Sequence, residues 1–149
     1  MKYQNKEFDK RFTPKYNKNY LKTSRINPCI DVFEEHGLLY CNILVEGVKL
    51  KLILDTGSCY NLINIKSSKI NNFENKPVIT NFEFKAFHDN GTMPMIVCDL
   101  HIAGRKMLLP FGVLDLDHLI PGVDGLLGYD FLKDCCNSLD FRSNKLSIK

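Results

Sequence analysis

Residues 50–64, LKLILDTGSCYNLIN, carry a carboxylate to the end of an apolar strand. Leucines at every second position before it give one apolar face, which is typical of a half-buried strand. Asp55 then opens a tight turn with the sequence DTGS, and apolar residues resume at Leu62. A carboxylate at the end of a buried strand is costly unless something stabilises its charge or a shared proton removes it. The turn is therefore a candidate site of acid–base chemistry.

The residues after Asp55 suit such a turn. A threonine hydroxyl at Thr56 can hydrogen-bond across a close turn. A glycine at Gly57 lets backbone N–H groups approach a carboxylate without a Cβ in the way. Taken alone, these residues are equally an ordinary Asp-containing turn, so the surrounding sequence has to decide between the two interpretations.

The sequence around the turn predicts short strands joined by hairpins. Residues 36–55 read as two apolar strands about a turn at Glu46-Gly47, and Asn90-Gly91 lies between two apolar runs, the strongest short hairpin signal. Two more hairpins are expected at Gly104-Arg105 and at residues 142–144. Residues 61–65 read as a short strand, and the polar residues 66–76 as turns.

One helix is expected late in the chain, because YDFLKDC (129–135) has a brief helical pattern. Many short strands with one short helix predict an all-β barrel or sandwich. At 149 residues and 44% hydrophobic composition, the chain has room for one ordinary domain with a real core.

The first 30 residues differ from the rest. They hold eight basic and two acidic residues, interleaved with aromatic side chains, although the whole chain has a net charge of only +3. Such a segment either contacts RNA weakly through charge and stacking or is a disordered linker, and the linker is the preferred interpretation. It has no apolar stretch of the signal-peptide kind, and no apolar run approaches the roughly 20 residues that cross a bilayer. We therefore expect a soluble intracellular protein with no membrane contact.

The cysteines are expected to be reduced thiols. Their spacing contains no C-x-x-C and no Cys/His ladder of the zinc type. Several lie in apolar runs, where a free thiol behaves as a small hydrophobic group. The sequence therefore predicts no metal and no cofactor. The six cysteines are Cys29, Cys41, Cys59, Cys98, Cys135 and Cys136.

The order of these motifs resembles the retroviral-type aspartic proteases (retropepsins), most closely those of long-terminal-repeat retrotransposons. LILDTGS (52–58) looks like their catalytic strand and loop, and DGLLGYDFL (124–132) looks like their second signature. The resemblance runs from about Leu38 to Ile148. It implies a small closed β-barrel with one short C-terminal helix, working as a two-fold homodimer. It divides the chain into a basic, disordered extension at 1–30 and a protease domain at 31–149.

The resemblance also implies a mechanism. An aspartic protease sets two carboxylates against one water, one ionised as general base and one protonated. Only Asp55 is followed by Thr/Ser-Gly here, so the second carboxylate would be Asp55 of a second copy of the chain. Thr56 would clasp the opposing loop, Gly57 would shape the site, and Ser58 would hydrogen-bond near the dyad.

Further roles follow from the same resemblance. In the second motif, Gly128 would let its strand pass close beneath the catalytic loop. A flap that closes over substrate would lie at the tip of a hairpin. The C-terminal KLSIK would pair across the two-fold axis, unless it pairs only within its own protomer. The second-motif residues are Leu126, Leu127 and Gly128, and the flap residues are His88, Asp89, Asn90, Gly91 and Thr92.

One departure from the family is informative. Many retroviral members pair an acidic residue two places after the catalytic glycine with an arginine directly after the second-motif glycine. Those positions here are Cys59 and Tyr129, so both halves of the ion pair are absent together. Neither position leaves a buried charge without its partner.

The expected function is an aspartic endopeptidase that cleaves extended polypeptide, in the first place its own polyprotein. Its location would be cytoplasmic, including within virus-like particles. The first alternative is a catalytically silent, domesticated domain that dimerises or holds peptide. The others are a nucleic-acid-binding protein acting through residues 1–30 and a host protease of the ubiquitin-linked, DNA-damage-inducible type.

Overall fold

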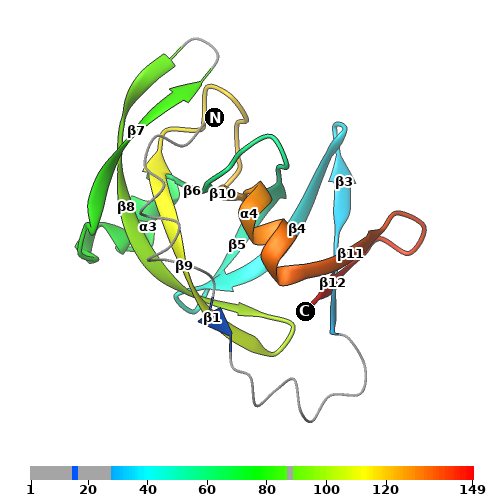
Figure 1. The fold of residues 1–149 in the computed structure, drawn as a ribbon. Helices are drawn as coiled ribbons and strands as arrows, with labels where there is room; N and C mark the ends of the chain where they lie inside the picture. Colours follow the sequence, from blue (N-terminus) through cyan, green and yellow to red (C-terminus); the bar gives the residue numbers. More distant parts are fainter. Residues whose placement is uncertain (1–14, 17–27, 87–88) are drawn as a thin grey trace.

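A computed structural model describes residues 15–16, 28–86 and 89–149, which form two β-sheets and a few short helices (Figure 1). The nine-stranded sheet runs β1-β9-β6-β10-β5-β4-β8-β7, with β3 paired to β4. Because β8 pairs with both β4 and β9, the path of pairings returns on itself. The three-stranded sheet has the order β11-β12-β2.

The elements have the following bounds. The strands are β1 (Lys15–Tyr16), β2 (Cys29–Asp31), β3 (Phe33–Glu35), β4 (Leu38–Val45), β5 (Val48–Leu54), β6 (Asn61–Asn64), β7 (Thr80–Ala86), β8 (Asp89–Ile102), β9 (Arg105–Leu114), β10 (Gly125–Leu127), β11 (Cys136–Asp140) and β12 (Lys145–Ile148). The helices are α3 (Ile65–Ile70), the 3-10 turn η1 (Phe73–Asn75) and α4 (Tyr129–Cys135). No helix in the described ranges is long and apolar enough to span a bilayer.

Tight two-residue turns join the strands of the main sheet. The β4–β5 turn has φ values of 50° at Glu46 and 77° at Gly47, and the β8–β9 turn has 51° at Ala103 and 77° at Gly104. Positive φ at both central residues is the type I′ geometry that fits the twist of a hairpin. The Glu46-Gly47 prediction is confirmed, and the later turn lies one residue before the predicted position.

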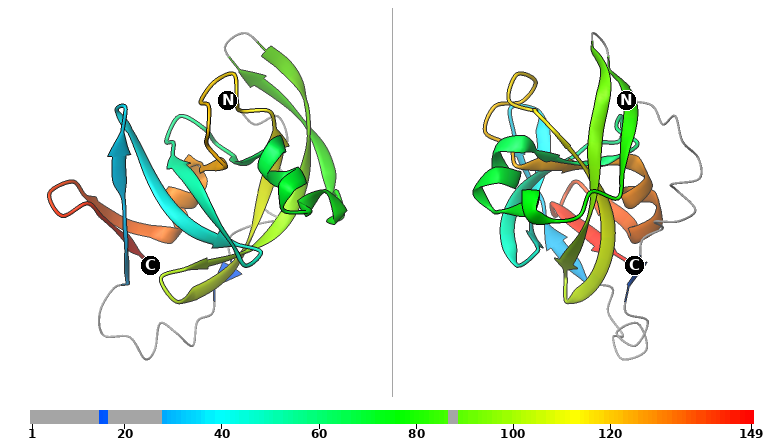
Figure 2. Two further views of the ribbon diagram at one scale, coloured as in Figure 1. Left: turned by 180° about the vertical axis from the view of Figure 1, so that it is seen from behind. Right: turned by 90° about the vertical axis from the view of Figure 1, so that its left-hand side faces the viewer.

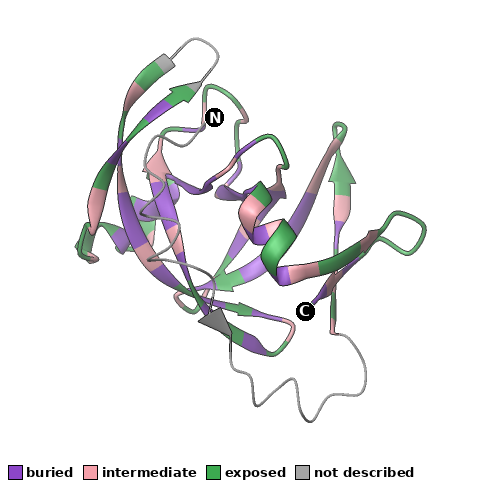
Figure 3. Cartoon of the chain, in the orientation of Figure 1, coloured by how far each residue is buried: buried purple, intermediate pink, exposed green. Residues whose placement is uncertain are grey.

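The apolar side chains form two buried clusters, and β5 contributes to both. The buried residues are purple in Figure 3. Leu50 and Leu52 belong to the larger cluster, which also holds Leu146 and Ile148 of β12. Ile53 belongs to the smaller cluster, which packs beneath the β7–β8 hairpin. The catalytic-loop candidate therefore follows a strand that contributes side chains to both clusters.

Helix α3 replaces the turns predicted for the polar residues that follow β6. Ser67 and Ser68 are buried, and the Ser67 hydroxyl donates to Asp124 Oδ1 at 2.6 Å. Asn71 Nδ2 donates to the Ser67 carbonyl at 2.8 Å near the end of the helix. These contacts come from distant parts of the chain or from the folded helix itself, which is why local composition did not reveal them.

The predicted Asn-Gly turn is wrong, because Asn90 and Gly91 lie inside β8. They pair with Lys85 and Phe84 of β7, and the pairing continues to Ala86 and Asp89. A Cβ on Gly91 would meet the Phe84 ring at 3.2 Å. Gly91 is thus a place where a neighbouring aromatic ring lies close to the backbone, one of the uses of glycine within strands.

The predicted hairpin at residues 142–144 is confirmed, but β12 lies in the middle of its sheet. It pairs with β11 on one side and with β2 on the other. Both hydrogen-bonding edges of β12 are therefore occupied within the protomer, which contradicts the expectation that KLSIK pairs across a two-fold axis.

Most of the predicted 1–30 extension lies outside the described residues. Lys15 and Tyr16 pair with Leu108 and Met107 of β9, and the described chain resumes at Pro28, ahead of β2.

The left view of Figure 2 shows the β11–β12 hairpin and α3 at opposite sides of the described domain.

Candidate active site

Asp55 directly follows β5, and the loop folds back onto its carboxylate. The Asp55 N–H donates to the Leu127 carbonyl at 3.0 Å. The Gly57 N–H donates to Asp55 Oδ1 at 2.8 Å, and the Ser58 N–H donates to the Asp55 carbonyl at 3.3 Å. The Gly57 N–H therefore fixes the orientation of this half-buried carboxylate.

Strand β10 lies between the two strands that flank the loop. It pairs parallel with β5 and antiparallel with β6, so that Leu126 lies beside both Ile53 and Leu62. The second motif predicted from the sequence is thus brought directly beside the catalytic-loop candidate. Leu126, Leu127 and Gly128 are all buried.

Two glycines allow this close approach. A Cβ on Gly128 would lie 2.5 Å from the Tyr60 carbonyl oxygen and 2.6 Å from that of Ser58. A Cβ on Gly125 would lie 2.2 Å from the Leu62 carbonyl oxygen. Real Cβ atoms essentially never come so near a backbone oxygen, so both positions require glycine for space rather than for an unusual φ.

Ser58 lies inside the loop. It is buried, and its hydroxyl donates to the Tyr60 carbonyl at 2.8 Å. Its own carbonyl accepts the Tyr129 N–H at 2.6 Å, which joins the loop to the first turn of α4. Within the chain, Ser58 therefore shapes the loop, and its hydrogen bond near a dyad stays a prediction.

Asn61 is a site residue that sequence reasoning missed. Only 8% of it is exposed. Its Oδ1 accepts the Gly128 N–H at 2.9 Å, and its Nδ2 donates to the Pro110 carbonyl at 3.3 Å. Asn61 thereby ties the catalytic loop to the second motif and to β9. The available signal was a polar residue at the head of a short strand whose two central residues are apolar.

Asp124 is a second missed residue, and it fixes the start of the second motif. Its Oδ2 accepts the Lys51 N–H at 2.8 Å, and its N–H donates to the Lys51 carbonyl at 3.1 Å. Its Oδ1 accepts the Ser67 hydroxyl, and its carbonyl accepts the Asn64 N–H at 2.7 Å. The sequence showed Asp124 only as a carboxylate without the Thr/Ser-Gly of a catalytic motif.

The positions of the missing retroviral ion pair are occupied by neutral groups. Cys59 is half-buried and Tyr129 is about half-exposed. Two hydrogen bonds join the loop region to the second motif here, from the Tyr129 N–H to the Ser58 carbonyl and from the Gly128 N–H to Asn61 Oδ1. The loop is therefore held by hydrogen bonds to backbone groups.

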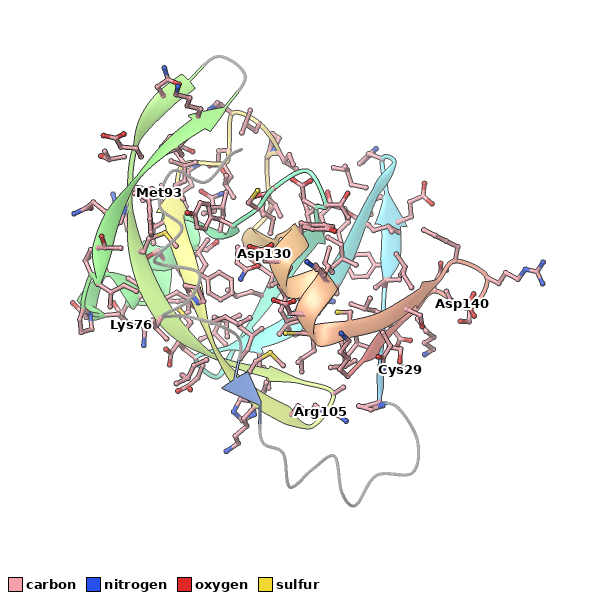
Figure 4. All side chains as sticks on the ribbon, in the orientation of Figure 1. Cys29, Lys76, Met93, Arg105, Asp130 and Asp140 are labelled. Atoms are coloured by element: carbon pink, nitrogen blue, oxygen red, sulfur yellow. The ribbon has the colours of Figure 1, made fainter. Side chains whose placement is uncertain are left out.

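The described residues predicted to form a flap lie on the β7–β8 hairpin, and an aromatic contact joins the base of this hairpin to the loop. The Tyr60 and Phe82 rings lie 5.4 Å apart between centroids, tilted by 35°. Met93, on the same hairpin, is fully buried, and a Cβ on Gly112 would lie 2.5 Å from its sulfur (Figure 4). Asn90 and Thr92 are exposed, Gly91 is half-buried, and His88 lies outside the described residues.

Thr56 is exposed at the rim of an apolar pocket of about 390 Å³. The pocket lies between β4, α4 and the β11–β12 hairpin. It is lined by Leu39, Leu54, Thr56, Leu132, Cys136, Asn137, Ser138, Leu139, Phe141 and Leu146. Within the described ranges, no group of three or more His, Cys, Asp or Glu side chains could hold a metal ion.

Comparison with known proteins gives matches at the level of structure alone. No protein-family profile and no curated protein sequence matches the chain. A retropepsin-like aspartic protease from Rickettsia conorii superposes with a TM-score of 0.58 and 16% identity, covering 92% of this chain and 93% of that one. The retroviral protease-like domain of Ddi1 from Leishmania major gives a TM-score of 0.51 and 15% identity, covering 75% and 93%. The chain therefore has the fold of the retropepsin-like aspartic proteases.

Proposed function

We propose that the chain is an aspartic endopeptidase that works as a homodimer, with one Asp55 from each protomer. The observation that carries the proposal is the position of Asp55. The carboxylate stands at the end of a buried strand, accepts the Gly57 N–H, and belongs to a loop that packs directly on Gly128 of the second motif. The shared retropepsin fold supports the same interpretation.

One carboxylate per chain leaves the chemistry incomplete. Within a dimer, the ionised Asp55 would take a proton from a water molecule while the oxygen of that water attacks the scissile carbonyl carbon. The protonated Asp55 of the second protomer would donate to the carbonyl oxygen. When the tetrahedral intermediate collapses, a proton passes to the departing amine and the C–N bond breaks. Two carboxylates that face the same water molecule share one proton, because the repulsion between their charges prevents both from being ionised.

The substrate is proposed to be polypeptide in extended conformation, including the polyprotein that would contain this chain, as in retrotransposons. The β7–β8 hairpin would be the flap that covers it, with exposed Asn90 and Thr92 near its tip. Thr56 would clasp the opposing loop, and residues 31–149 would form the protease domain as a closed barrel. The rest of the predicted 1–30 extension would lie outside it, because β1 (Lys15–Tyr16) pairs with β9 and β2 begins at Cys29, both within the folded domain.

The test is peptide cleavage by purified protein at mildly acid pH, with and without a hydroxyl transition-state inhibitor such as pepstatin. Asp55→Asn keeps the shape of the side chain and removes the general base, so cleavage should fall to background while circular dichroism is unchanged. Asp115→Asn, at an exposed carboxylate outside the loop, is the matched control and should cleave normally. Proteolysis by Asp55→Asn protein at the wild-type rate would contradict the proposal.

A further inference from the structure

One buried side chain holds the residues that lead into the second motif. Asn64, the last residue of β6, is 2% exposed. Its Nδ2 donates to Asp117 Oδ1 at 2.7 Å and to the Val123 carbonyl at 3.0 Å. Its Oδ1 accepts the Leu116 N–H at 3.4 Å. Both ends of residues 116–124, which we call the 116–124 segment, are therefore bonded to a single amide group.

Two further contacts fix the same segment to β6 and α3. The Asn64 N–H donates to the Asp124 carbonyl at 2.7 Å, and Lys66 Nζ forms an ion pair with Asp117 Oδ2. The Lys66 ammonium, together with the Asn64 amide, holds the pKa of the Asp117 carboxyl below its usual range. Asp117 therefore stays ionised at mildly acid pH, where cleavage is expected, and remains an acceptor for Asn64.

The segment packs against the elements around the candidate site. Leu116 and Val123 are buried in the smaller cluster. The same cluster contains Tyr60 of the loop after β5, Phe82 of the β7–β8 hairpin and Leu126 of the second motif. In Figure 1 the segment, coloured gold, lies on the same side of the fold as that loop and the tip of the hairpin. A displacement of the segment would therefore disturb side chains from three elements of the site.

The segment also presents a large apolar side chain to solvent. Leu119 is 61% exposed. The N–H groups of Leu119 and Ile120 both donate to the Leu116 carbonyl, at 3.0 and 2.9 Å. Since the Leu116 N–H is itself bonded to Asn64, the position of this exposed turn depends on the one amide group.

From these contacts we infer that Asn64 is a positioning residue for the proposed peptide cleavage, because it holds the 116–124 segment in the shape in which the segment borders bound substrate. The inference rests on the proposed function. Within the described residues, none of the hydrogen bonds of Asn64 reaches Asp55 or Gly57, which carry and orient the carboxylate. Loss of the Asn64 bonds should therefore weaken substrate binding and leave the chemical step almost unchanged.

The experiment measures KM and kcat for cleavage of one peptide by a set of variants. Asn64→Asp preserves the size of the side chain but replaces its donor with an oxygen that faces Asp117 and the Val123 carbonyl. KM should rise on the order of tenfold, with kcat within about twofold of the wild type. Adding Asp117→Asn in the same chain reverses the bond, so that position 117 donates to position 64, and should recover most of the lost affinity.

A matched control separates positioning from loss of stability. Val45 is fully buried in the larger cluster, next to the β4–β5 turn, whereas Asp55 follows the other end of β5. Val45→Ala should lower the thermal unfolding temperature without changing KM. Hydrogen exchange followed by mass spectrometry adds a measurement that needs no catalysis. Exchange in the 116–124 segment should be faster in Asn64→Asp, return toward the wild-type rate when Asp117→Asn is added, and stay unchanged in Val45→Ala.

The outcomes separate this inference from the proposed function. If the wild type cleaves peptide but Asn64→Asp keeps the wild-type KM, or Val45→Ala raises KM equally, the inference is overturned while the proposed endopeptidase stands. If the double variant recovers neither KM nor exchange protection, the Asn64–Asp117 bond is not responsible, and the inference is likewise overturned. A wild type that cleaves no peptide overturns both. If Asn64→Asp loses its β-type circular dichroism, Asp117→Ala, at the more exposed end of the same bond, decides by whether KM rises.

Discussion

At the scale of single residues, Asn61 and Gly128 show how the loop is supported. Gly128 has no room for a Cβ beneath the loop, and its N–H needs a partner because the position is buried. Asn61 supplies that partner at 2.9 Å. An unpaired buried N–H costs about 1–3 kcal/mol, so the side chain has a measurable role in stability.

We therefore predict that Asn61→Ala lowers the free energy of unfolding by about 2 kcal/mol, because it leaves the Gly128 N–H without an acceptor. The measurement is urea denaturation followed by circular dichroism. Asn42→Ala, at an exposed position of β4, is the control and should stay within about 0.5 kcal/mol of the wild type. An Asn61→Ala protein as stable as this control would show that the bond contributes nothing net.

The buried thiols give a prediction about alkylation rates. Burial raises the pKa of Cys41, Cys98, Cys135 and Cys136 to about 12, well above that of an ordinary thiol. The raised pKa keeps these thiols protonated, so at pH 8 their thiolate fraction is about a thousandfold lower than for an ordinary thiol. Native protein should alkylate slowly at these four positions and fast at exposed Cys29, and denaturant should abolish the difference. Peptide mass mapping measures the alkylation at each cysteine. Equal alkylation rates at the buried cysteines and at Cys29 in native protein would contradict the burial.

At the scale of elements, β12 is the central strand of the small sheet. Leu146 and Ile148 are buried in the main core, and β12 bonds to both β11 and β2. Removal of β12 would therefore remove buried side chains from the core and break its hydrogen bonds to both neighbouring strands. The main role of β12 is thus to stabilise the fold of each protomer.

Deletion of residues 145–149 should consequently destabilise the protomer itself. Burying a leucine or isoleucine contributes about 1.5–3 kcal/mol, and two such residues are lost, a large share of a typical total stability of about 5–15 kcal/mol. Circular dichroism and thermal denaturation measure the loss. Deletion of Lys149 alone, which is exposed, is the control. A truncated protein that melts like the wild type but fails to dimerise would restore the idea that this strand pairs between protomers.

At the scale of the whole molecule, the described domain has one Asp-Thr-Gly loop. A site built from two chains makes activity depend on dimer formation, so specific activity should rise with protein concentration and saturate as the dimer forms.

The activity should also follow a bell-shaped pH profile with its optimum on the acid side of neutrality, because two carboxylates share one proton.

Mixing experiments test the two-chain site directly. If wild-type and Asp55→Asn chains exchange freely, and only dimers with two Asp55 carboxylates cleave, activity at fixed total protein should fall as the square of the wild-type fraction. An equal mixture should then retain about a quarter of the full activity, since a quarter of random dimers carry both carboxylates. Titration of peptide cleavage against the mixing ratio gives the curve. A linear decline would mean that one carboxylate suffices.

The sequence by itself determined the features that depend on local geometry. Asp55 after an alternating strand, the turn at Glu46-Gly47 and the hairpin at 142–144 were all readable, because strand alternation and type I′ turns are set by neighbouring residues. The order of the two motifs likewise led to the fold found by structural comparison. The catalytic roles assigned to these residues remain predictions.

Only the tertiary structure decided where local preference was weak or overridden. Asn90-Gly91 favours a turn locally, yet both residues pair with β7 inside a strand, where the Phe84 ring lies close to Gly91. Residues 65–70 carry no clear helical signal, yet contacts with Asp124 anchor a helix there. KLSIK reads as a free apolar edge, yet β2 occupies it. Propensities are worth fractions of a kcal/mol per residue, whereas a buried side chain or hydrogen bond is worth about one or more, so partners distant in sequence made these choices.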